Sequence, residues 1–328
     1  MILQSYGKLV CINTLVTTYI IMIKDSLKPK NWGIWTVIGI INLGSRLPFF
    51  AQKWVSLSLG FIIKPFLRSR NIIATENLKI VFPDYTAKQI KNIVNKSYYS
   101  MVLSGAEIAT SWFASKKRFK RIEFEWEDKS LEIFKKYHEN RNTSLILLGF
   151  HFHSMEIMGR YFGANFPPIT VMYQKNTNEL IEDLIKKYRE KNLERCLDSK
   201  NFIAVIRSLK KRYTMWYAPD QDFGLESSGV ENSVFAPFFG KPCSTLTVTP
   251  WLAEKTKSVV LPIYYVRKKC LKKYKIVVGE PLEFTGDAYH DAKITNEFLE
   301  NAARKYPEQY LWQHRRFRTR PNGEPQIY

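Results

Sequence analysis

The sequence predicts an α/β protein with a mixed, largely parallel central sheet wrapped by helices, preceded by an N-terminal membrane-anchoring helical region. Two observations predict this class. From residue 83 onward, short apolar strands alternate with amphipathic helices, as they do in largely parallel sheets. The first 70 residues instead contain uncharged apolar runs with basic and aromatic residues near their ends. We therefore expect an anchoring region at residues 1–70 and a globular domain at residues 71–328.

The N-terminal region has three apolar runs, at residues 9–23, 31–45 and 54–63. Each is shorter than the roughly 18 to 20 residues that a spanning helix needs. Basic residues and tryptophans lie near the ends of the runs, where a bilayer interface would favour them. This pattern favours a short anchor or a helix in the membrane plane over a cleaved signal peptide. Buried helices of the globular domain are the alternative.

The globular region is expected to begin with a helix at residues 86–112, where apolar residues recur at helical spacing. The run TSLILLGF at residues 143–150 predicts a strand that is buried on both faces. A helix at residues 155–163 should follow it. Further strands are expected at residues 169–173, 213–218, 258–266 and 274–278, and further helices at residues 178–192, 201–211, 247–255 and 295–305.

The most specific pattern places His151 directly after the buried strand and Glu156 five residues later. Ligands usually bind at this end of the strands in an open α/β sheet. Within one continuous helix, five residues turn through about 500°, which would keep the two side chains apart. If His151 lies in the turn before the helix, Glu156 can accept the proton of one ring nitrogen. The other nitrogen can then act as a general base toward a substrate hydroxyl.

Other interpretations of this segment stay open. His153 lies three residues before Glu156 and could take the place of His151 as its partner. The two histidines could also form a metal pair, but no third ligand follows nearby, so we expect no metal and no cofactor. The sequence has neither a Gly-x-Ser-x-Gly segment nor a Gly-rich phosphate loop. An activated thioester donor would make a protein nucleophile unnecessary.

Two further polar clusters follow the same logic. In the segment APDQD at residues 218–222, Asp220 and Asp222 come after a predicted strand and could orient the histidine, bind sugar hydroxyls or cap a turn. The tail at residues 307–321 holds four arginines among aromatic residues. Guanidinium groups suit phosphate, a membrane or nucleic acid, and a solvated basic face is the alternative.

The charge balance indicates an acidic partner. The chain holds 50 Lys and Arg residues against 30 Asp and Glu residues, a net charge of +20. Such a charge attracts nucleic acid, anionic lipid or an acidic carrier protein. The four cysteines are irregularly spaced and include no CxxC pair, which favours reduced thiols in a domain that faces the cytoplasm.

These clusters together resemble the late acyltransferases of lipid A biosynthesis, the lauroyl and myristoyl transferases of Gram-negative bacteria. The resemblance covers nearly the whole chain. It includes Asn31-Trp32, residues 70–83, HFHSME at 151–156, Tyr173 with Asn178, APDQDFG at 218–224, FAPFFG at 235–240 and PEQYLWQHRRFRTRP at 307–321. It implies the fold of the glycerolipid acyltransferases, with residues 71–328 as the catalytic domain and an apolar groove for the acyl chain.

The resemblance also implies a reaction and a place in the cell. The fatty acyl group would come from acyl carrier protein and go to a hydroxyl of a 3-hydroxyacyl chain on a Kdo-bearing lipid A precursor, without metal. The enzyme would belong to the inner membrane, with its active site at the cytoplasmic face. The family's catalytic histidine and acid map onto His151 and Glu156. Residues that would contact glycolipid phosphates or support the site are Arg160, Arg189, Asp220 and Asp222.

One position departs from the family, because many relatives carry arginine where this chain has Gln174; the change would alter contacts to acceptor phosphates. Glycerolipid and lysophospholipid acyltransferases use the same histidine–acid device, but they generally carry Asp at the position of Glu156. A non-catalytic basic protein that binds membrane or nucleic acid would explain the charge. It would leave the strand and its His-x4-Glu pattern without a purpose, so we expect no nucleic-acid partner.

Overall fold

The central sheet has seven strands in the order β1-β11-β10-β2-β5-β3-β4. The computed structural model describes residues 28–140, 142–227, 230–269 and 271–328. The strands β10 and β11 pair antiparallel, and the other neighbours pair parallel. The predicted mixed, largely parallel sheet is therefore confirmed. Its strands are β1 (Glu123–Trp126), β2 (Ser144–Leu148), β3 (Ile169–Tyr173), β4 (Arg195–Asp198), β5 (Thr214–Tyr217), β10 (Ser258–Lys269) and β11 (Lys273–Val278).

Helices pack on both faces of this sheet. One face carries α7 (Ser130–His138), α8 (Met155–Asn165) and α9 (Glu179–Arg189), and the other carries α10 (Phe202–Lys210), α11 (Val248–Thr256) and α12 (Ala288–Lys305). Hydrogen bonds from β5 show this division. Thr214 bonds to His138 of α7, whereas Tyr217, three residues later, bonds to Thr249 of α11. Residues an odd number apart on a strand face opposite ways.

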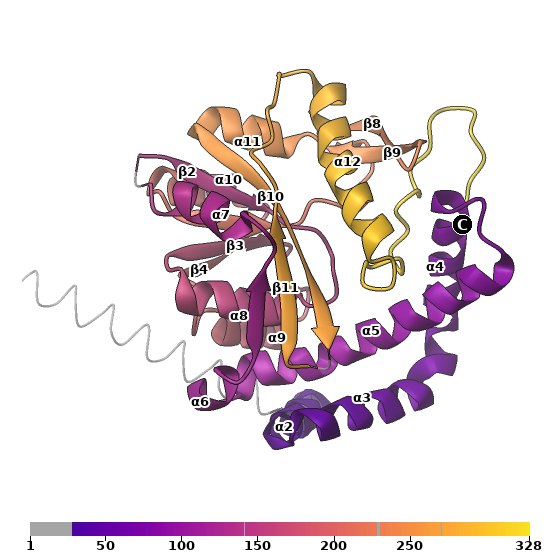
Figure 1. Cartoon of the computed structure of the whole chain (residues 1–328), viewed down its shortest axis with the longest axis vertical. Helices are drawn as coiled ribbons and strands as arrows, with labels where there is room; N and C mark the ends of the chain where they lie inside the picture. Colours follow the sequence, from indigo (N-terminus) through magenta and orange to yellow (C-terminus); the bar gives the residue numbers. More distant parts are fainter. Residues whose placement is uncertain (1–27, 141, 228–229, 270) are drawn as a thin grey trace, which may run out of the picture.

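Helix α5 (Ala87–Phe113) connects the sheet to the N-terminal helices. It begins with a capping box, in which the Thr86 hydroxyl accepts from the Gln89 amide and the Gln89 side chain accepts from the Thr86 amide. It then runs across the lower end of β10 and β11 (Figure 1). Helix α8 packs against it, and so do α2, α3 and α4. The helix predicted at residues 86–112 is confirmed.

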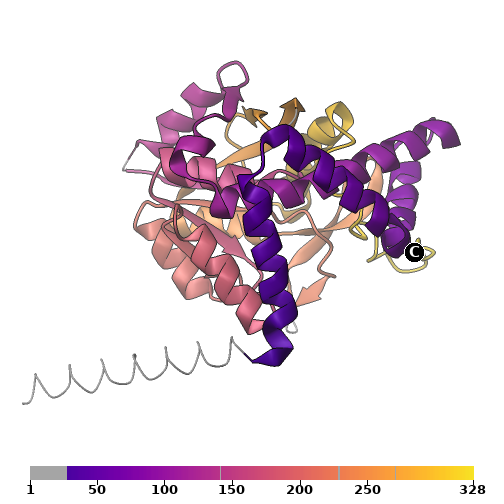
Figure 2. The same cartoon turned by 90° about the horizontal axis from the view of Figure 1, so that it is seen from below.

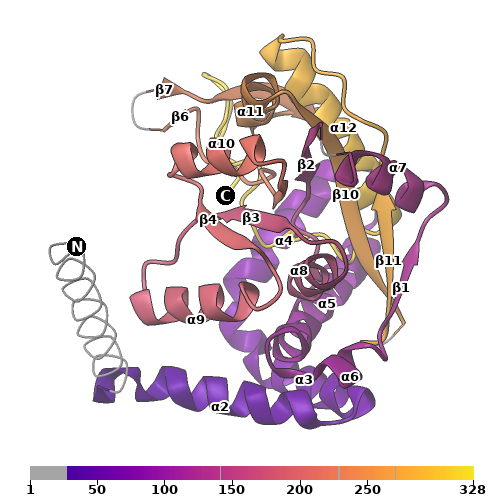
Figure 3. The same cartoon turned by 90° about the vertical axis from the view of Figure 1, so that its left-hand side faces the viewer.

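The N-terminal helices are η1 (Pro29–Asn31), α2 (Trp32–Arg46), α3 (Phe49–Ile63), η2 (Lys64–Leu67) and α4 (Arg68–Val81). Two of the three predicted apolar runs form α2 and α3, and the run at residues 9–23 lies outside the described residues. Seen from below, the indigo helices α2 and α3 lie on the surface that faces the viewer (Figure 2), and α2 runs along one end of the molecule (Figure 3). Across residues 28–328, apart from the positions left undescribed, no helix is both long and apolar enough to cross a membrane.

Some elements were not predicted from the sequence. These are α6 (Lys116–Phe119), β1, α7, β4, the short pair β6 (Glu226–Ser227) and β7 (Val230–Glu231), and the hairpin β8 (Ser233–Phe238) with β9 (Lys241–Leu246). Helix α12 begins at Ala288, seven residues before the predicted start. Asp287 caps it there, because its side chain accepts from the amide of His290 at 2.7 Å.

Candidate active site

His151 lies in the turn between β2 and α8, as the sequence predicts, and its ring is held by Asp220. The distance from Nδ1 of His151 to Oδ1 of Asp220 is 2.6 Å, and the His151 backbone amide donates to Oδ2 at 3.0 Å. Burial alone would raise the pKa of Asp220, but the charge and hydrogen bonds of His151 outweigh it and hold this pKa below its usual range. Asp220 is therefore an ionised acceptor that fixes the proton of His151 on Nδ1.

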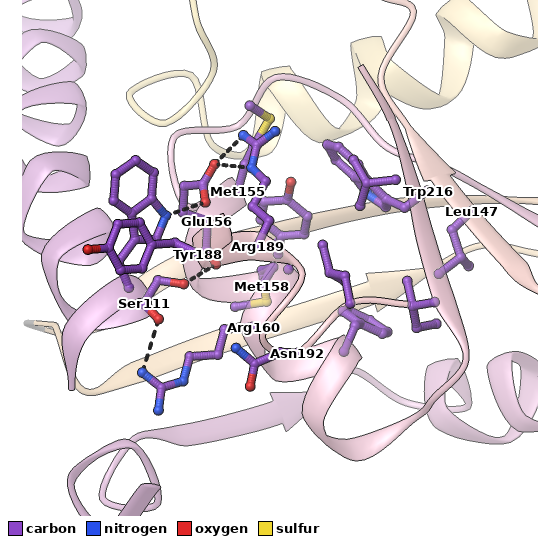
Figure 4. A pocket seen from close by; sticks show the side chains of 17 residues that line it. Ser111, Leu147, Met155, Glu156, Met158, Arg160, Tyr188, Arg189, Asn192 and Trp216 are labelled. Carbon is purple, nitrogen blue, oxygen red and sulfur yellow. Dashed lines mark hydrogen bonds and ion pairs between the residues drawn. The ribbon is translucent and has the colours of Figure 1, made fainter. Parts of the chain in front are cut away.

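The expected hydrogen bond from His151 to Glu156 needs correction. Glu156 lies in the first turn of α8, and its Oε1 accepts from Nε of Arg189 at 2.9 Å and also from Nη2. Its Oε2 accepts from the indole nitrogen of Trp112 at 3.1 Å. Figure 4 shows the Glu156 side chain directed toward Arg189. The carboxylate that orients the histidine is thus Asp220, whereas Glu156 orients a guanidinium.

An apolar pocket opens beside the Glu156–Arg189 pair (Figure 4). Its floor is a row of side chains across three neighbouring strands, since Trp216 of β5 lies in register with Leu147 of β2 and with Val171 of β3. Helix α8 forms the opposite wall with Met155, Met158 and Phe162, and α5 and α9 supply Trp112 and Tyr188. The rings of Trp112 and Tyr188 stack at 5.0 Å. The pocket is therefore lined mainly by apolar side chains, with the Glu156–Arg189 pair as a charged part of its wall.

Arg160, which was considered as a phosphate ligand, is buried and used internally. Its Nη1 donates to the carbonyl oxygens of Thr110 and Ser111 at 2.8 and 3.0 Å, at the last turn of α5. Its guanidinium also lies 4.2 Å above the ring of Phe119. The Thr110 carbonyl also accepts from the Ala114 amide at 3.1 Å, so Arg160 adds a side-chain donor to the backbone cap at the end of α5.

Asp222 joins the second polar cluster to the C-terminal tail. It is buried, and its carboxylate accepts from the amide and the hydroxyl of Thr319, both at 2.7 Å. The Asp222 amide in turn donates to Nε2 of His314 at 3.0 Å. Burial lowers the pKa of His314 to about 4, so this ring is a neutral acceptor. Asp222 is a support of the turn that carries Asp220.

The tail packs against the His151 turn, although Arg315 and Arg318 remain exposed. Phe152 pairs with Tyr310 in a β-bridge, and the amide of Leu311 donates to the carbonyl of His151 at 3.0 Å. Arg316 is buried and donates to the carbonyl of Ser244 at 2.6 Å. The tail therefore stabilises the turn that contains His151, the candidate base.

His153 is a poor candidate for the base. Its Nδ1 lies 2.9 Å from the Ser100 hydroxyl, and its Nε2 is buried. Burial, and secondarily the charge of Arg267, lowers the pKa of His153 to about 3, so the ring stays neutral. The described part of the chain contains no group of three His, Cys, Asp or Glu side chains placed to hold a metal ion.

Sequence reasoning missed two pocket residues, Trp112 and Tyr265. Trp112 lies at the end of a predicted helix, and its position in the sequence does not predict a contact with Glu156. Tyr265 carried a usable signal, because Leu261, Ile263 and Tyr265 alternate along a predicted strand and must share one face. The pairing of that strand with β2 was needed to place this face at the pocket.

Sequence comparison identifies the family to which this site belongs. The family model for the bacterial lipid A biosynthesis acyltransferases matches residues 22–319. The chain belongs to this family. This acyltransferase is 31% identical to the lipid A biosynthesis lauroyltransferase of Escherichia coli strain K12 over 312 residues, which cover 92% of this chain and 96% of the relative.

Two other relatives from the same strain match over similar lengths. Identity to the lipid A biosynthesis palmitoleoyltransferase is 29% over 308 residues, covering 93% of this chain and 97% of that protein. Identity to the lipid A biosynthesis myristoyltransferase is 24% over 310 residues, covering 93% of each. The three relatives are named for three different acyl groups, so what they share is acyl transfer in lipid A biosynthesis.

Proposed function

We propose that this acyltransferase moves a fatty acyl chain from acyl carrier protein to the hydroxyl of a 3-hydroxyacyl chain on a Kdo-bearing lipid A precursor, with His151 as the general base. The observation that carries the proposal is the 2.6 Å contact between His151 Nδ1 and Asp220. Glu156, five residues after His151, lines the apolar pocket. A proton fixed on Nδ1 leaves Nε2 as the basic nitrogen, which is the arrangement of histidine bases in acyl transfer.

The proposed step balances without a protein nucleophile. Nε2 of His151 removes the proton of the acceptor hydroxyl while the hydroxyl oxygen attacks the thioester carbonyl carbon. The new C–O bond forms, the C–S bond breaks, and His151 returns the proton to the leaving sulfur. Asp220, whose pKa is held low, stabilises the imidazolium in between. His151 is only partly exposed, with 19% of its side chain accessible, so substrate must bring its hydroxyl into the turn.

Arg189, which is held by Glu156, is proposed to act on the oxygen of the thioester carbonyl. Glu156 uses Nε and Nη2 of Arg189, so Nη1 is not part of this pair. Burial alone would lower the pKa of Arg189, but the Glu156 carboxylate outweighs it and raises this pKa, which keeps the guanidinium charged. A fixed cation at the pocket mouth would stabilise the negative charge that develops on the carbonyl oxygen. Glu156 therefore belongs to the catalytic group through Arg189.

The N-terminal helices support the proposed place at the cytoplasmic face of the inner membrane, with residues 1–70 as the anchor and residues 71–328 as the catalytic domain. Large apolar side chains on α2, α3 and η2 are exposed, including Phe61 at 73% and Phe66 at 82%. Lys53 and Lys64 lie among them. Apolar side chains mixed with basic ones suit a surface that rests on anionic lipid.

The experiment that tests this function is mass spectrometry of the lipid product. Purified wild-type protein and the variants His151→Ala and Asp220→Asn are incubated with the tetraacyl Kdo-bearing precursor and a mixture of acyl carrier protein thioesters. Wild type should add one acyl mass, and both variants should add far less. Parallel incubations use a pentaacyl precursor and a lysophospholipid. Acylation of the lysophospholipid alone would replace the proposed acceptor, and full activity of His151→Ala would remove the proposed base.

A further inference from the structure

Tyr265 of β10 has a buried hydroxyl for which the described residues supply no hydrogen-bond partner. Its side chain is 1% exposed and lines the apolar pocket. A polar group that is buried without a partner carries a free-energy cost. Such a cost at the wall of a binding pocket indicates that a ligand supplies the missing partner.

The sheet register places Tyr265 on the pocket side, level with the His151 turn. Leu261 of β10 pairs with Leu147 of β2 in parallel, so both side chains face the pocket. Tyr265 follows Leu261 by four residues, and His151 follows Leu147 by four residues. Side chains along a strand point alternately to the two faces, so Tyr265 and Leu261, four residues apart, lie on the same face. Tyr265 therefore lies toward the end of the sheet at which β2 runs into the His151 turn.

The charges around Tyr265 keep its hydroxyl a donor. Burial raises the pKa of Tyr265 well above 10, and the nearby carboxylates of Asp220, Glu156 and Glu107 raise it further, while Arg189 opposes them. The hydroxyl therefore stays protonated at neutral pH and can donate a hydrogen bond.

We propose that Tyr265 donates a hydrogen bond to the carbonyl oxygen of the acyl thioester when the acyl chain fills the pocket. This inference rests on the proposed function. A chain that enters the apolar pocket brings its carbonyl as the first polar group behind the hydrocarbon, and a carbonyl oxygen is an acceptor only. Tyr265 and Arg189 would then hold the same oxygen from two elements, β10 and α9, while His151 activates the attacking hydroxyl.

The test compares Tyr265→Phe with Tyr264→Phe. The neighbouring Tyr264 is also buried, but it faces the opposite side of the sheet, where its ring lies against Phe152 and Phe298. Both variants lose one hydroxyl from the same strand. Thioester consumption is measured with the dodecanoyl thioester of acyl carrier protein, lipid product is measured separately, and thermal unfolding is recorded for each protein.

Tyr265→Phe should lower kcat by about 100-fold, as expected for the loss of one oxyanion donor. Its KM for the thioester should change little, and its melting temperature should be equal or higher, because the removed hydroxyl has no partner inside the protein. Tyr264→Phe should keep the wild-type kcat. Wild-type turnover in Tyr265→Phe, or a loss of turnover that only follows a loss of stability, would overturn the inference.

The two readouts separate this inference from the proposed function. Thioester consumption by wild type without acylated precursor would count against the acceptor, and a loss of that consumption in Tyr265→Phe would still support the hydrogen bond to the carbonyl. Acylated precursor from wild type and Tyr265→Phe at equal rates would overturn the role of Tyr265 alone. If wild type consumes no thioester, both ideas fail.

Discussion

Two glutamate–arginine pairs share their chemistry and differ in their surroundings. Glu107 and Arg267 join α5 to β10 through a 2.6 Å contact, with 1% and 7% of their side chains exposed. Glu156 and Arg189 join α8 to α9, with 15% and 22% exposed. The first pair is closed off in the interior and the second lines the apolar pocket. The same two residue types therefore occupy an interior position in one region and a pocket wall in the other.

The partners of each pair show why their roles differ. Oε1 of Glu107 also accepts from Tyr274 at 2.8 Å and from Ser154 at 3.1 Å, so it ties β11 and the start of α8 to the pair. Glu156 has Trp112 as its further donor, at the rim of the pocket. A buried network with several internal donors resists change, whereas a pair at a pocket can exchange one contact for a ligand. Stability should therefore depend on the first pair and turnover on the second.

The largest effect is expected from Arg267→Met. This change leaves the Glu107 carboxylate buried without its cation and should lower the free energy of unfolding by about 3 to 5 kcal/mol. Chemical denaturation measures it. The double variant Glu107→Gln/Arg267→Met also removes the unpaired carboxylate and should recover part of the lost free energy of unfolding. If Arg267→Met lowers the free energy of unfolding by less than an ordinary surface substitution does, the two pairs do not differ in their contribution to stability.

Arg189→Gln should have the opposite profile. We expect kcat to fall by about 100- to 1,000-fold, as for other fixed donors at a developing oxyanion, while stability changes by less than about 1 kcal/mol. Steady-state kinetics and denaturation on the same preparation measure both. Arg207→Gln, at an exposed arginine of α10, is the matched control and should leave both values unchanged. Loss of stability without loss of turnover would reverse the assignment.

Acid should weaken the interior network through His153. The folded protein holds the pKa of His153 at about 3, whereas the unfolded chain takes up this proton near pH 6.5. The unfolded state therefore binds more protons between these values, and stability falls as the pH falls from 6.5 toward 3. About 2 kcal/mol should be lost between neutral pH and pH 5. Unfolding at both pH values measures the loss. His153→Gln should reduce it, and His290→Gln, at an exposed histidine, should not.

The smallest effect is expected from Trp112→Phe. The ring still stacks on Tyr188, but Glu156 loses the indole donor at 3.1 Å. One hydrogen bond of this kind is worth about 1 kcal/mol, so kcat should fall about five-fold with little change in unfolding. An effect as large as that of Arg189→Gln would mean that the indole, and not the guanidinium, holds Glu156 in place.

The sequence was sufficient to predict elements whose burial is simple. Strand β2 is buried on both faces, so its run of apolar residues predicted it, together with the position of His151 after it. The start of α12 was placed too late because its first three residues are exposed and its first buried residue, Asp291, is charged. The hairpin β8–β9 was not predicted because it forms a separate two-stranded sheet and contains two prolines, Pro237 and Pro242, which pair with each other.

The partner of the histidine could not be predicted from spacing along the chain. Leu148 of β2 pairs with Tyr217 of β5, and His151 and Asp220 each follow these residues by three positions. The two turns therefore leave the sheet side by side, and their contact is a property of strand pairing. A His-x4-Glu spacing draws attention to Glu156, although the helix that starts at Met155 directs this side chain to α9. The tail arginines were equally ambiguous until Arg316 was placed in the interior.

The contacts of the C-terminal tail give the order in which a newly made chain can become active. Residues 307–319 follow the last strand and the last helix, yet they bind the backbone of the His151 turn and the carboxylate of Asp222. On the ribosome, the sheet can assemble before these residues leave the exit tunnel. The histidine turn gains its final support only after they have emerged, so activity should appear only once residues 307–319 have left the tunnel.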